Sequence, residues 1–400
     1  MALREREVRF AEISRSESAD QLSSRVLIFS EFTRLAQERG AVNLSQGFPE
    51  PLSNQLIREQ MALSVDAEGW AYADPRGLLA LRESVASLYA MHQRTNDVVV
   101  TSGCTEALLM ALWALKGAYG DCVAVLEPFY PYYPGFARLV GLEYAAIPMR
   151  NSEGRFEPDW QRIEEVARGG ARILLLNSPH NPTGWVLNRQ DLAVVEALAR
   201  KYGIAIVVDH AYSGYVYDEQ PDLVAELLHR IPESTWVAGT ASKCLSAPGL
   251  RVGWLLCPER EQKFALELHL HLTYCQPPPL QSLVSWLLNA DSHRRDELNR
   301  RYERKRNELC AALMSLGLDV VRPEGGHFLV ADYRGVSGLN SRQFALYFTE
   351  QYGVTPLPVD PFYLEAGPPQ VRFSFAAPLP DIETACDSML RWDAGRKVAI

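Results

Sequence analysis

The 400-residue sequence lacks several features that define other classes of protein. No apolar run is long enough to cross a membrane, and residues 1–10 are charged throughout and lack the apolar core of a signal peptide. Positive charge is not in excess, because the formal net charge is −9, which argues against a general nucleic-acid-binding role. The seven cysteines have no paired metal-ligand spacing and, being odd in number, favour a reducing compartment over a disulfide framework. These absences predict a cytoplasmic protein with no membrane, nucleic-acid or metal partner.

Apolar runs without polar alternation define the expected secondary structure. Residues 173–176 and 204–208 are short apolar runs that end in polar or loop-forming residues, and helical stretches such as 188–202 separate them. This pattern is typical of parallel strands that are buried on both faces of a sheet. The sequence therefore predicts an α/β fold in which helices flank a mostly parallel sheet.

The distribution of these patterns suggests two domains. With 47% hydrophobic residues, the chain is long enough to bury more than one core. We expect a large domain over residues 46–290 and a smaller α+β domain formed by residues 1–45 and 291–400. Within the small domain, residues 1–24 are expected to form a mobile arm.

The most informative segment surrounds Lys243. Small residues at Ala241, Ser242 and Ser246 leave room for a bulky group beside this lysine, as a lysine that forms a Schiff base requires. Arg251, eight positions further on, offers a planar fork that suits a phosphate. Together these residues suggest pyridoxal phosphate held at both ends. The alternative is an ordinary surface lysine in a polar loop, since most lysines are exposed.

Three other polar residues follow the apolar runs. Asn181 lies in the loop after 173–176, while Asp209 and Tyr212 follow 204–208. In open α/β sheets, ligands bind outside the carboxyl ends of the strands. We therefore expect these side chains to lie at the same edge of the sheet as the lysine.

Residues 101–109 suggest a site for an anion. The run 97–100 is followed by a turn of small residues and the start of an apolar helix, so free backbone N–H groups and the helix dipole would face the ligand. An ordinary helix cap is the alternative, because Ser or Thr close to Glu also caps helices. In combination with Arg251, the turn predicts the second half of a phosphate cradle.

From about residue 25 to residue 392, the chain resembles the fold-type I, pyridoxal-phosphate-dependent class I aminotransferases. The resemblance rests on the motifs above, which occur in the order found in that family. Segments 32–36 and 43–49 are similar to the branch of kynurenine/glutamine transaminases and methionine aminotransferases. The resemblance implies a type I fold, pyridoxal 5′-phosphate as cofactor, small-molecule amino acid and 2-oxo acid substrates, and a homodimer with shared active sites.

The resemblance implies a cofactor-binding role for each matching residue. Lys243 resembles the lysine that bonds to the cofactor aldehyde and later moves the α-proton, and Asp209 resembles the carboxylate that keeps the ring nitrogen protonated. Asn181 and Tyr212 resemble the pair that hydrogen-bonds the ring oxygen. The residues that resemble the phosphate cup are Cys104, Thr105, Thr240, Ser242 and Arg251.

The remaining matches concern the ring face, the partner subunit and the substrate. Phe129 resembles the aromatic residue that stacks on the cofactor ring, although a core aromatic after a strand has the same spacing. Tyr72 resembles a tyrosine that reaches the phosphate of the neighbouring subunit. Arg372 resembles the arginine that binds the substrate carboxylate, with a solvated edge-strand arginine as the alternative. The other candidate substrate-binding residues are Gly47, Asn181, Phe29, Tyr274 and His327.

Two histidines depart from the pattern of the family. His210 follows Asp209 where this branch commonly has glutamate, and His327 replaces a small or apolar residue near the substrate region. A lone histidine is more often structural, but a titratable group here could serve additional acid–base chemistry.

Two enzymatic hypotheses follow from the resemblance. The first is ping-pong transfer of an amino group from a neutral aromatic or sulfur-containing L-amino acid to a 2-oxo acid. The alternative is a pyridoxal-phosphate-dependent elimination, cyclisation or oxidative deamination, with His210 or His327 assisting. A ligand-sensing domain of a transcription regulator is disfavoured, because only residues 1–24 precede the match, and a non-catalytic scaffold is disfavoured because the catalytic motifs are intact.

Overall fold

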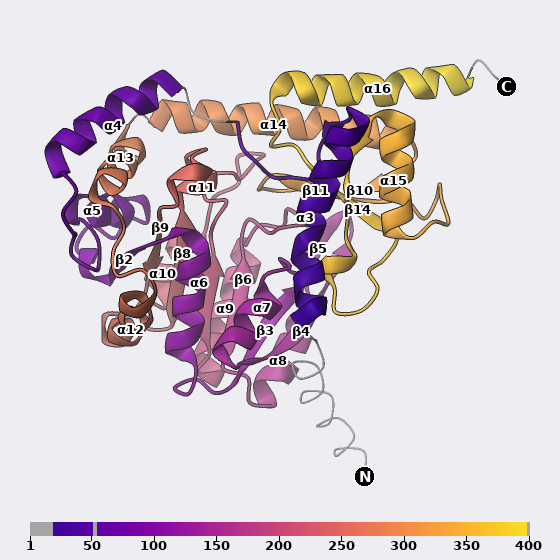
Figure 1. Ribbon diagram of the computed structural model, residues 1–400. Helices are drawn as coiled ribbons and strands as arrows, with labels where there is room; N and C mark the ends of the chain where they lie inside the picture. The colour runs from indigo at the N-terminus through magenta and orange to yellow at the C-terminus, as the bar shows by residue number, and fades with distance from the viewer. Residues whose placement is uncertain (1–18, 51–53, 291, 398–400) are drawn as a thin grey trace, which may run out of the picture.

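An eight-stranded sheet forms the centre of the computed structural model, which describes residues 19–50, 54–290 and 292–397 (Figure 1). The strand order is β2-β9-β8-β7-β6-β3-β4-β5. The pairs β8–β7, β7–β6, β6–β3 and β3–β4 are parallel, whereas β2–β9, β9–β8 and β4–β5 are antiparallel. The strands are β2 Val98–Thr101, β3 Cys122–Glu127, β4 Glu143–Ser152, β5 Arg155–Pro158, β6 Ile173–Asn177, β7 Ala205–Asp209, β8 Thr235–Thr240 and β9 Gly253–Leu256.

Helices cover both faces of this sheet, which explains the uninterrupted apolar runs. Leu174 and Ile206 pack into the core on one face, while their neighbours Leu175 and Val207 pack into the core on the other. The strands expected at 173–176 and 204–208 are confirmed, and so is the α/β fold class. The helices are α4 Asn54–Glu68, α5 Leu79–Leu88, α6 Gly103–Leu115, α7 Tyr133–Val140, α8 Trp160–Arg168, α9 Arg189–Tyr202, α10 Val224–Arg230, α12 Gln262–Leu272 and α13 Pro278–Asn289, with 3₁₀ turns at Thr95–Asp97, Pro248–Leu250 and Glu259–Glu261.

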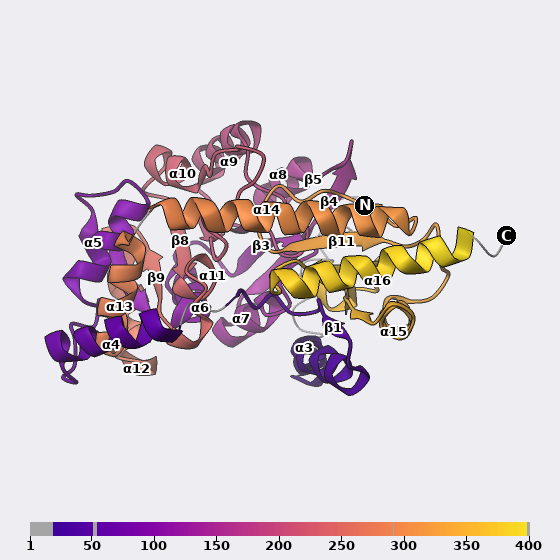
Figure 2. The same ribbon diagram turned by 90° about the horizontal axis from the view of Figure 1, so that it is seen from above.

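A second, four-stranded antiparallel sheet lies above the carboxyl ends of the central strands (Figure 1). Helices α14 and α16 run side by side over it, as Figure 2 shows. Its elements are α14 Ser292–Ser315, β10 Asp319–Val320, β11 Phe328–Asp332, α15 Ser341–Tyr352, β13 Leu357–Pro358, the 3₁₀ turn Asp360–Phe362, β14 Gln370–Ser374 and α16 Leu379–Lys397.

The first described segment packs with the C-terminal part of the chain. Helix α3 (Ala19–Arg39) leads into β1 (Val42–Asn43), which pairs in parallel with β12 (Val354–Thr355). Of the arm expected at 1–24, residues 1–18 lie outside the described residues, and residues 19–24 belong to α3.

The carboxyl ends of β6, β7 and β8 bring the expected site residues to one edge. Asp209 is the last residue of β7, and Lys243 lies in the short helix α11 (Ala241–Cys244) directly after β8. The backbone changes there from strand to helix because Thr240, in extended conformation, accepts a hydrogen bond from the Ser242 N–H (3.1 Å) at its Oγ1. Over the part of the chain that the structure describes, no helix combines the length and apolar character needed to cross a bilayer.

Candidate active site

A cavity of about 310 Å³ opens at this edge of the central sheet. It brings together most of the residues singled out in the sequence, although they come from different elements. The expected residues that line it are Cys104, Thr105, Asn181, Asp209, Tyr212, Thr240, Ser242, Lys243 and Arg251. The surface-lysine alternative for Lys243 is therefore wrong.

One end of the cavity has the donors that a phosphate needs. Helix α6 begins at Gly103, which has a positive φ of 74°, and a Cβ at that position would lie 2.9 Å from Arg251 Nη2. Arg251 Nη1 lies 3.4 Å from Ser242 Oγ, and Thr105 follows in the first turn of α6. The turn therefore requires glycine, because only glycine lets the backbone and the guanidinium approach closely enough to share one anion.

The opposite end is built around Asp209, whose carboxylate accepts hydrogen bonds at both oxygens. The Tyr133 hydroxyl donates to Oδ2 (2.7 Å), and Oδ1 accepts from the Ala211 N–H (3.1 Å) and lies 3.5 Å from Cys104 Sγ. Burial raises the pKa of Asp209, and the hydrogen bond from Tyr133 partly offsets that rise. A cationic ring nitrogen is the partner that such a buried carboxylate favours.

Replacement of Tyr133 by phenylalanine is expected to lower kcat by about tenfold, because a hydrogen bond to a charged group contributes about 1.5–3 kcal/mol. Without it, the Asp209 carboxylate is a stronger base and competes for the proton on the ring nitrogen. Steady-state kinetics at saturating cofactor measure the effect. Tyr202→Phe is the matched control, since its hydroxyl donates to Glu164 (2.8 Å) away from the cavity. An unchanged kcat in Tyr133→Phe would remove Tyr133 from the site.

Lys243 lies between these two ends. Its Nζ donates a hydrogen bond to the Gly47 carbonyl (2.7 Å), and burial, together with the positive charges of Arg372 and Arg251, lowers its pKa from 10.5 to about 8. A Cβ at Gly47 would come within 2.3 Å of the Phe328 ring, so this position has no room for a side chain. Near physiological pH, a much larger fraction of this lysine is therefore the neutral amine than of an ordinary lysine.

This pKa predicts how the apoprotein takes up the cofactor. Only the neutral amine attacks an aldehyde, so the rate of bond formation should rise with pH and level off above about 8. Stopped-flow absorbance after mixing apoprotein with pyridoxal phosphate measures this rate. A rate that keeps rising toward pH 10.5, the ordinary lysine value, would contradict the description of Lys243 as buried and surrounded by positive charge.

Arg372 is buried next to the cavity, and only 1% of its surface is exposed. Strand β14, which carries it, lies between β11 and β13, so the solvated edge-strand alternative is wrong. Its Nη1 donates to Asn181 Oδ1 (3.0 Å) and Nη2 to the Ser45 carbonyl (2.6 Å), while Nε has no hydrogen-bond partner within the described residues. Burial lowers its pKa to about 10, which leaves it charged at neutral pH. Three rings surround the guanidinium at 4.0–5.4 Å from their centroids: Phe328, Phe362 and Phe29.

The position of Phe129 does not fit the expected stacking role. Its side chain is fully buried in the core and meets Tyr144 edge to face at 6.2 Å, which agrees with the core alternative. Its neighbour Tyr130 lines the cavity instead. Consecutive residues after β3 point to opposite sides of the chain, so a shift by one residue exchanges a core position for a cavity position.

Tyr274 and Tyr72 lie outside the cavity. Tyr274 packs edge to face against Tyr72 at 5.4 Å, and 86% of the Tyr72 surface is exposed. Within one chain, Tyr274 is therefore not a substrate-pocket residue, and Tyr72 points into open space.

Neither of the two unusual histidines lines the cavity. His327 is fully buried and stacks on Tyr302 at 4.5 Å, and burial lowers its pKa well below the ordinary histidine value. His210 Nε2 pairs with Asp222 Oδ2 (2.7 Å), and its Nδ1 pairs with the Tyr89 hydroxyl (3.0 Å). Neither imidazole lines the cavity, and His327 reaches it only through Tyr212, whose ring it meets edge to face at 5.2 Å. The structure therefore gives no support to the expected substrate contact of His327.

Sequence reasoning missed several residues that line or support the cavity. Asn177 ends the same apolar strand whose loop drew attention to Asn181, and Phe48 follows Gly47. The other aromatic lining comes from the segment after β3 and from α7. The missed residues are Phe48, Leu108, Tyr130, Tyr132, Phe136, Asn177, Ala211 and Pro248 in the lining and Tyr133 behind Asp209.

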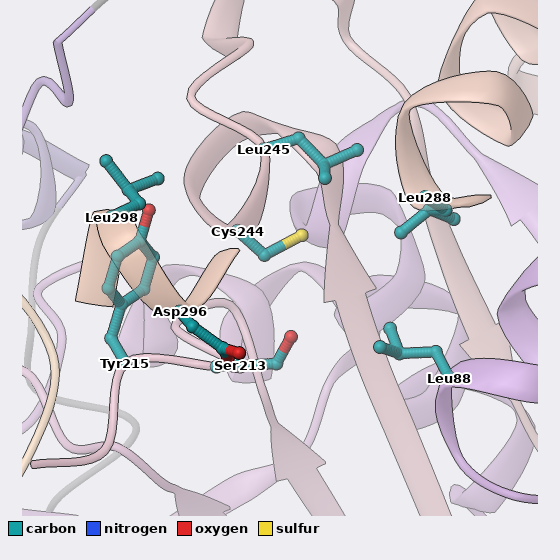
Figure 3. Close-up of a pocket in the computed structure, with 9 residues that line it drawn as sticks. Leu88, Ser213, Tyr215, Cys244, Leu245, Leu288, Asp296 and Leu298 are labelled. Atoms are coloured by element: carbon teal, nitrogen blue, oxygen red, sulfur yellow. The ribbon is translucent and has the colours of Figure 1, made fainter. Parts of the chain in front are cut away.

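A second cavity of about 280 Å³ lies next to the helix that carries the lysine (Figure 3). Leu88, Leu245 and Leu288 give it a largely apolar wall, and the Cys244 and Ser213 side chains face it. The Tyr215 hydroxyl, on its rim, donates to the Lys243 carbonyl (3.2 Å). This hydrogen bond helps to fix the position of the Lys243 backbone.

The fold and the donor set together define a pyridoxal-phosphate-dependent enzyme of fold type I. The residues present fit the cofactor: a helix N-terminus with Arg251 for the phosphate, a buried carboxylate for the ring nitrogen, and a lysine of lowered pKa between them.

Comparison with known proteins identifies the family. The sequence matches the family "Aminotransferase class I and II" over residues 39–389, and the chain belongs to it. It is 30% identical to the methionine aminotransferase of Escherichia coli (strain K12) over 87% of this chain and 91% of that protein. It is 27% identical to kynurenine–oxoglutarate transaminase 3 of Mus musculus over 92% of this chain and 88% of that protein. A solved methionine aminotransferase structure from Escherichia coli superimposes with a TM-score of 0.83 at 28% identity, covering 91% of this chain and 96% of that one. The expected family and its pyridoxal phosphate dependence are confirmed.

Proposed function

We propose that this aminotransferase moves the amino group of a neutral aromatic or sulfur-containing L-amino acid to a 2-oxo acid by a ping-pong mechanism. The observation that carries the proposal is that Lys243, Asp209 and Arg251 line one cavity, with Arg372 buried beside it. Pyridoxal phosphate, when bound, supplies an aldehyde that reacts with amines and a ring that accepts electrons when its nitrogen is protonated.

Each residue of the cavity has a role in this proposal. Thr105, Ser242 and Arg251, with backbone N–H groups of α6, hold the phosphate. Cys104 lies in the first turn of α6, and Thr240 caps the short helix α11 that carries Ser242 and Lys243. Asp209 keeps the ring nitrogen protonated. Asn181 and Tyr212 are the residues that would hydrogen-bond the ring oxygen, and Tyr130 would cover the ring face.

Substrate handling falls to Arg372 and Lys243. The Arg372 guanidinium, with its unpaired Nε, binds the α-carboxylate of the amino acid, and the Gly47 backbone, whose carbonyl accepts from Lys243 Nζ, lies beside that group. Lys243 Nζ, whose pKa is lowered to about 8, takes the proton from the substrate Cα before water releases the 2-oxo acid.

Aromatic side chains support the substrate class. Phe48, Tyr130, Tyr132 and Phe136 line the cavity, and Phe29 lies near the guanidinium of Arg372. The similarity to a methionine aminotransferase and to kynurenine transaminases agrees with such side chains. A panel of amino donors with 2-oxo acid acceptors tests the proposal: methionine and aromatic amino acids should give the highest kcat/KM, and preference for aspartate would contradict it.

Replacement of Arg372 by alanine is expected to lower kcat/KM for amino acids by roughly 100-fold, since a hydrogen bond to a charged group contributes about 1.5–3 kcal/mol. Amines without a carboxylate should react equally with the variant and the wild type, which separates lost recognition from a damaged fold. Arg334→Ala, which removes an exposed arginine, is the control. Equal losses for amines and amino acids would assign Arg372 another role.

The alternative of elimination, cyclisation or oxidative deamination has less support. It relied on additional acid–base chemistry from His210 or His327, and neither imidazole lines the cavity. Transamination needs neither histidine.

We also propose a cytoplasmic homodimer in which Tyr72 reaches the phosphate site of the partner subunit. Trp70, Tyr72 and Leu272 expose 74%, 86% and 56% of their surfaces, more than a monomer favours for large apolar groups. Residues 46–290 would form the cofactor-binding domain, and residues 1–45 with 291–400 the smaller one. Sedimentation equilibrium tests the dimer, and a monomer at micromolar concentration would contradict it.

A further inference from the structure

A buried carboxylate and a buried imidazole meet beneath the turn that begins α6. Glu106 Oε1 faces His269 Nδ1 at 2.9 Å, and the second ring nitrogen, Nε2, lies 2.9 Å from the Pro75 carbonyl oxygen. His269 belongs to α12, which packs against α6. Its side chain is fully buried, and Glu106 is 7% exposed.

The hydrogen-bond partners indicate that His269 carries two protons. A carboxylate oxygen and a carbonyl oxygen are both acceptors, and neutral imidazole has only one N–H to donate. Glu106 has further donors, because Oε1 also accepts from the Thr273 hydroxyl (2.7 Å) and Oε2 from the Ser102 N–H. Burial alone would raise the pKa of Glu106, but the hydrogen bonds from His269, Ser102 and Thr273 lower it. The pair is therefore an imidazolium and a carboxylate.

The location of the pair gives it a consequence for anion binding. Glu106 follows Thr105 in the first turn of α6, and its carboxylate binds the backbone of Ser102 in the turn that faces the phosphate. A negative charge here would repel a phosphate, whereas an imidazolium next to it cancels that charge. Through Pro75, the same imidazolium also ties the turn to the 72–77 loop, which carries Tyr72.

We propose that His269 is a positioning residue of the phosphate cup: it neutralises Glu106 so that the carboxylate can hold the α6 turn without repelling the cofactor phosphate. The inference rests on the phosphate cup proposed above. It concerns an electrostatic contribution to binding, and His269 itself touches no cofactor atom.

Equilibrium binding to the apoprotein tests this role with two ligands, pyridoxal phosphate and pyridoxal, which lacks the phosphate. His269→Gln should bind pyridoxal phosphate roughly tenfold more weakly, as expected for an unscreened charge several ångströms away, and should bind pyridoxal as the wild type does. The double variant Glu106→Gln with His269→Gln should recover most of the lost affinity, because no uncompensated charge remains.

The control is His271→Gln, an exposed histidine two positions further along α12. Unchanged phosphate-ligand affinity in His269→Gln, or a double variant at least as weak as the single one, would overturn the inference. A purely structural pair gives the second result, since losing both partners would damage the turn further. Wild-type apoprotein that binds neither ligand would overturn the proposed cofactor site itself.

A measurement on the wild-type protein covers the case in which the variants do not fold. Nitrogen-15 NMR of labelled histidine distinguishes an imidazolium, with two protonated nitrogens, from a neutral ring with one. At neutral pH, His269 should show two protonated ring nitrogens, because both nitrogens face oxygen acceptors. A neutral ring at that pH would contradict the inference.

Discussion

Replacement of Lys243 by alanine is expected to reduce transamination by at least about 1,000-fold, within the range that a positioned general base contributes. The variant loses both the amine that bonds to the cofactor aldehyde and the base that moves the α-proton. Pyridoxal phosphate should still bind through the phosphate cup and Asp209, but without the absorbance of the lysine-bound form. Steady-state kinetics and the absorbance spectrum measure the two effects separately.

Lys263→Ala serves as the control, because this lysine is exposed on α12 and its Nζ lies over the neighbouring Phe264 ring. It should retain full activity and the wild-type spectrum. A Lys243→Ala protein that keeps the lysine-bound absorbance would mean that a different lysine bonds to the cofactor. The placement of Lys243 at the centre of the site would then be wrong.

Replacement of Asp209 by asparagine is expected to lower kcat by roughly 1,000-fold, the upper range for loss of one preorganised electrostatic group. An amide of the same shape cannot hold a proton on the ring nitrogen, so the ring withdraws electrons less well. Binding should suffer much less than chemistry, because the phosphate cup and Lys243 remain. The comparison of kcat with the dissociation constant of the cofactor measures this difference.

Asp319→Asn, which changes an exposed carboxylate in β10, is the matched control. If Asp209→Asn lost cofactor affinity and kcat in equal proportion, Asp209 would act mainly as an anchor. A variant with wild-type kcat would exclude the carboxylate from the chemistry altogether.

Much of the fold could be predicted because its signals are local. The apolar runs at 173–176 and 204–208 became β6 and β7, since strands covered on both faces show no polar alternation. The polar residues after these runs, Asn181 and Asp209, then had to meet at one edge, and both line the same cavity as Lys243. The order of the strands and the pairing of β1 with β12 depend on contacts between distant segments, and nothing in the local pattern specifies them.

The site was predictable where a residue type is tied to the end of an element. Lys243, Asp209 and Arg251 are such residues. Phe129 was misplaced because the direction of a side chain in the segment after a strand depends on backbone geometry, and Tyr130 takes the cavity position. Tyr133 could not be found from sequence, since its contact with Asp209 joins residues 76 positions apart.

Chemical type alone was a poor guide for the histidines. His327 and His210 drew attention because they interrupt a family pattern, yet both are satisfied or packed away from the cavity. His269 gave no signal in the sequence, and its importance arises only from the helix packing that brings it to Glu106.

A half-reaction tests the central claim, transamination, most directly. Purified protein loaded with pyridoxal phosphate is mixed with methionine or an aromatic amino acid, without any 2-oxo acid, and the absorbance and products are followed. We predict that the cofactor converts to pyridoxamine phosphate and that one 2-oxo acid is released for each active site. Continued turnover with release of ammonia, while the lysine-bound absorbance persists, would contradict transamination and identify an elimination or oxidation instead.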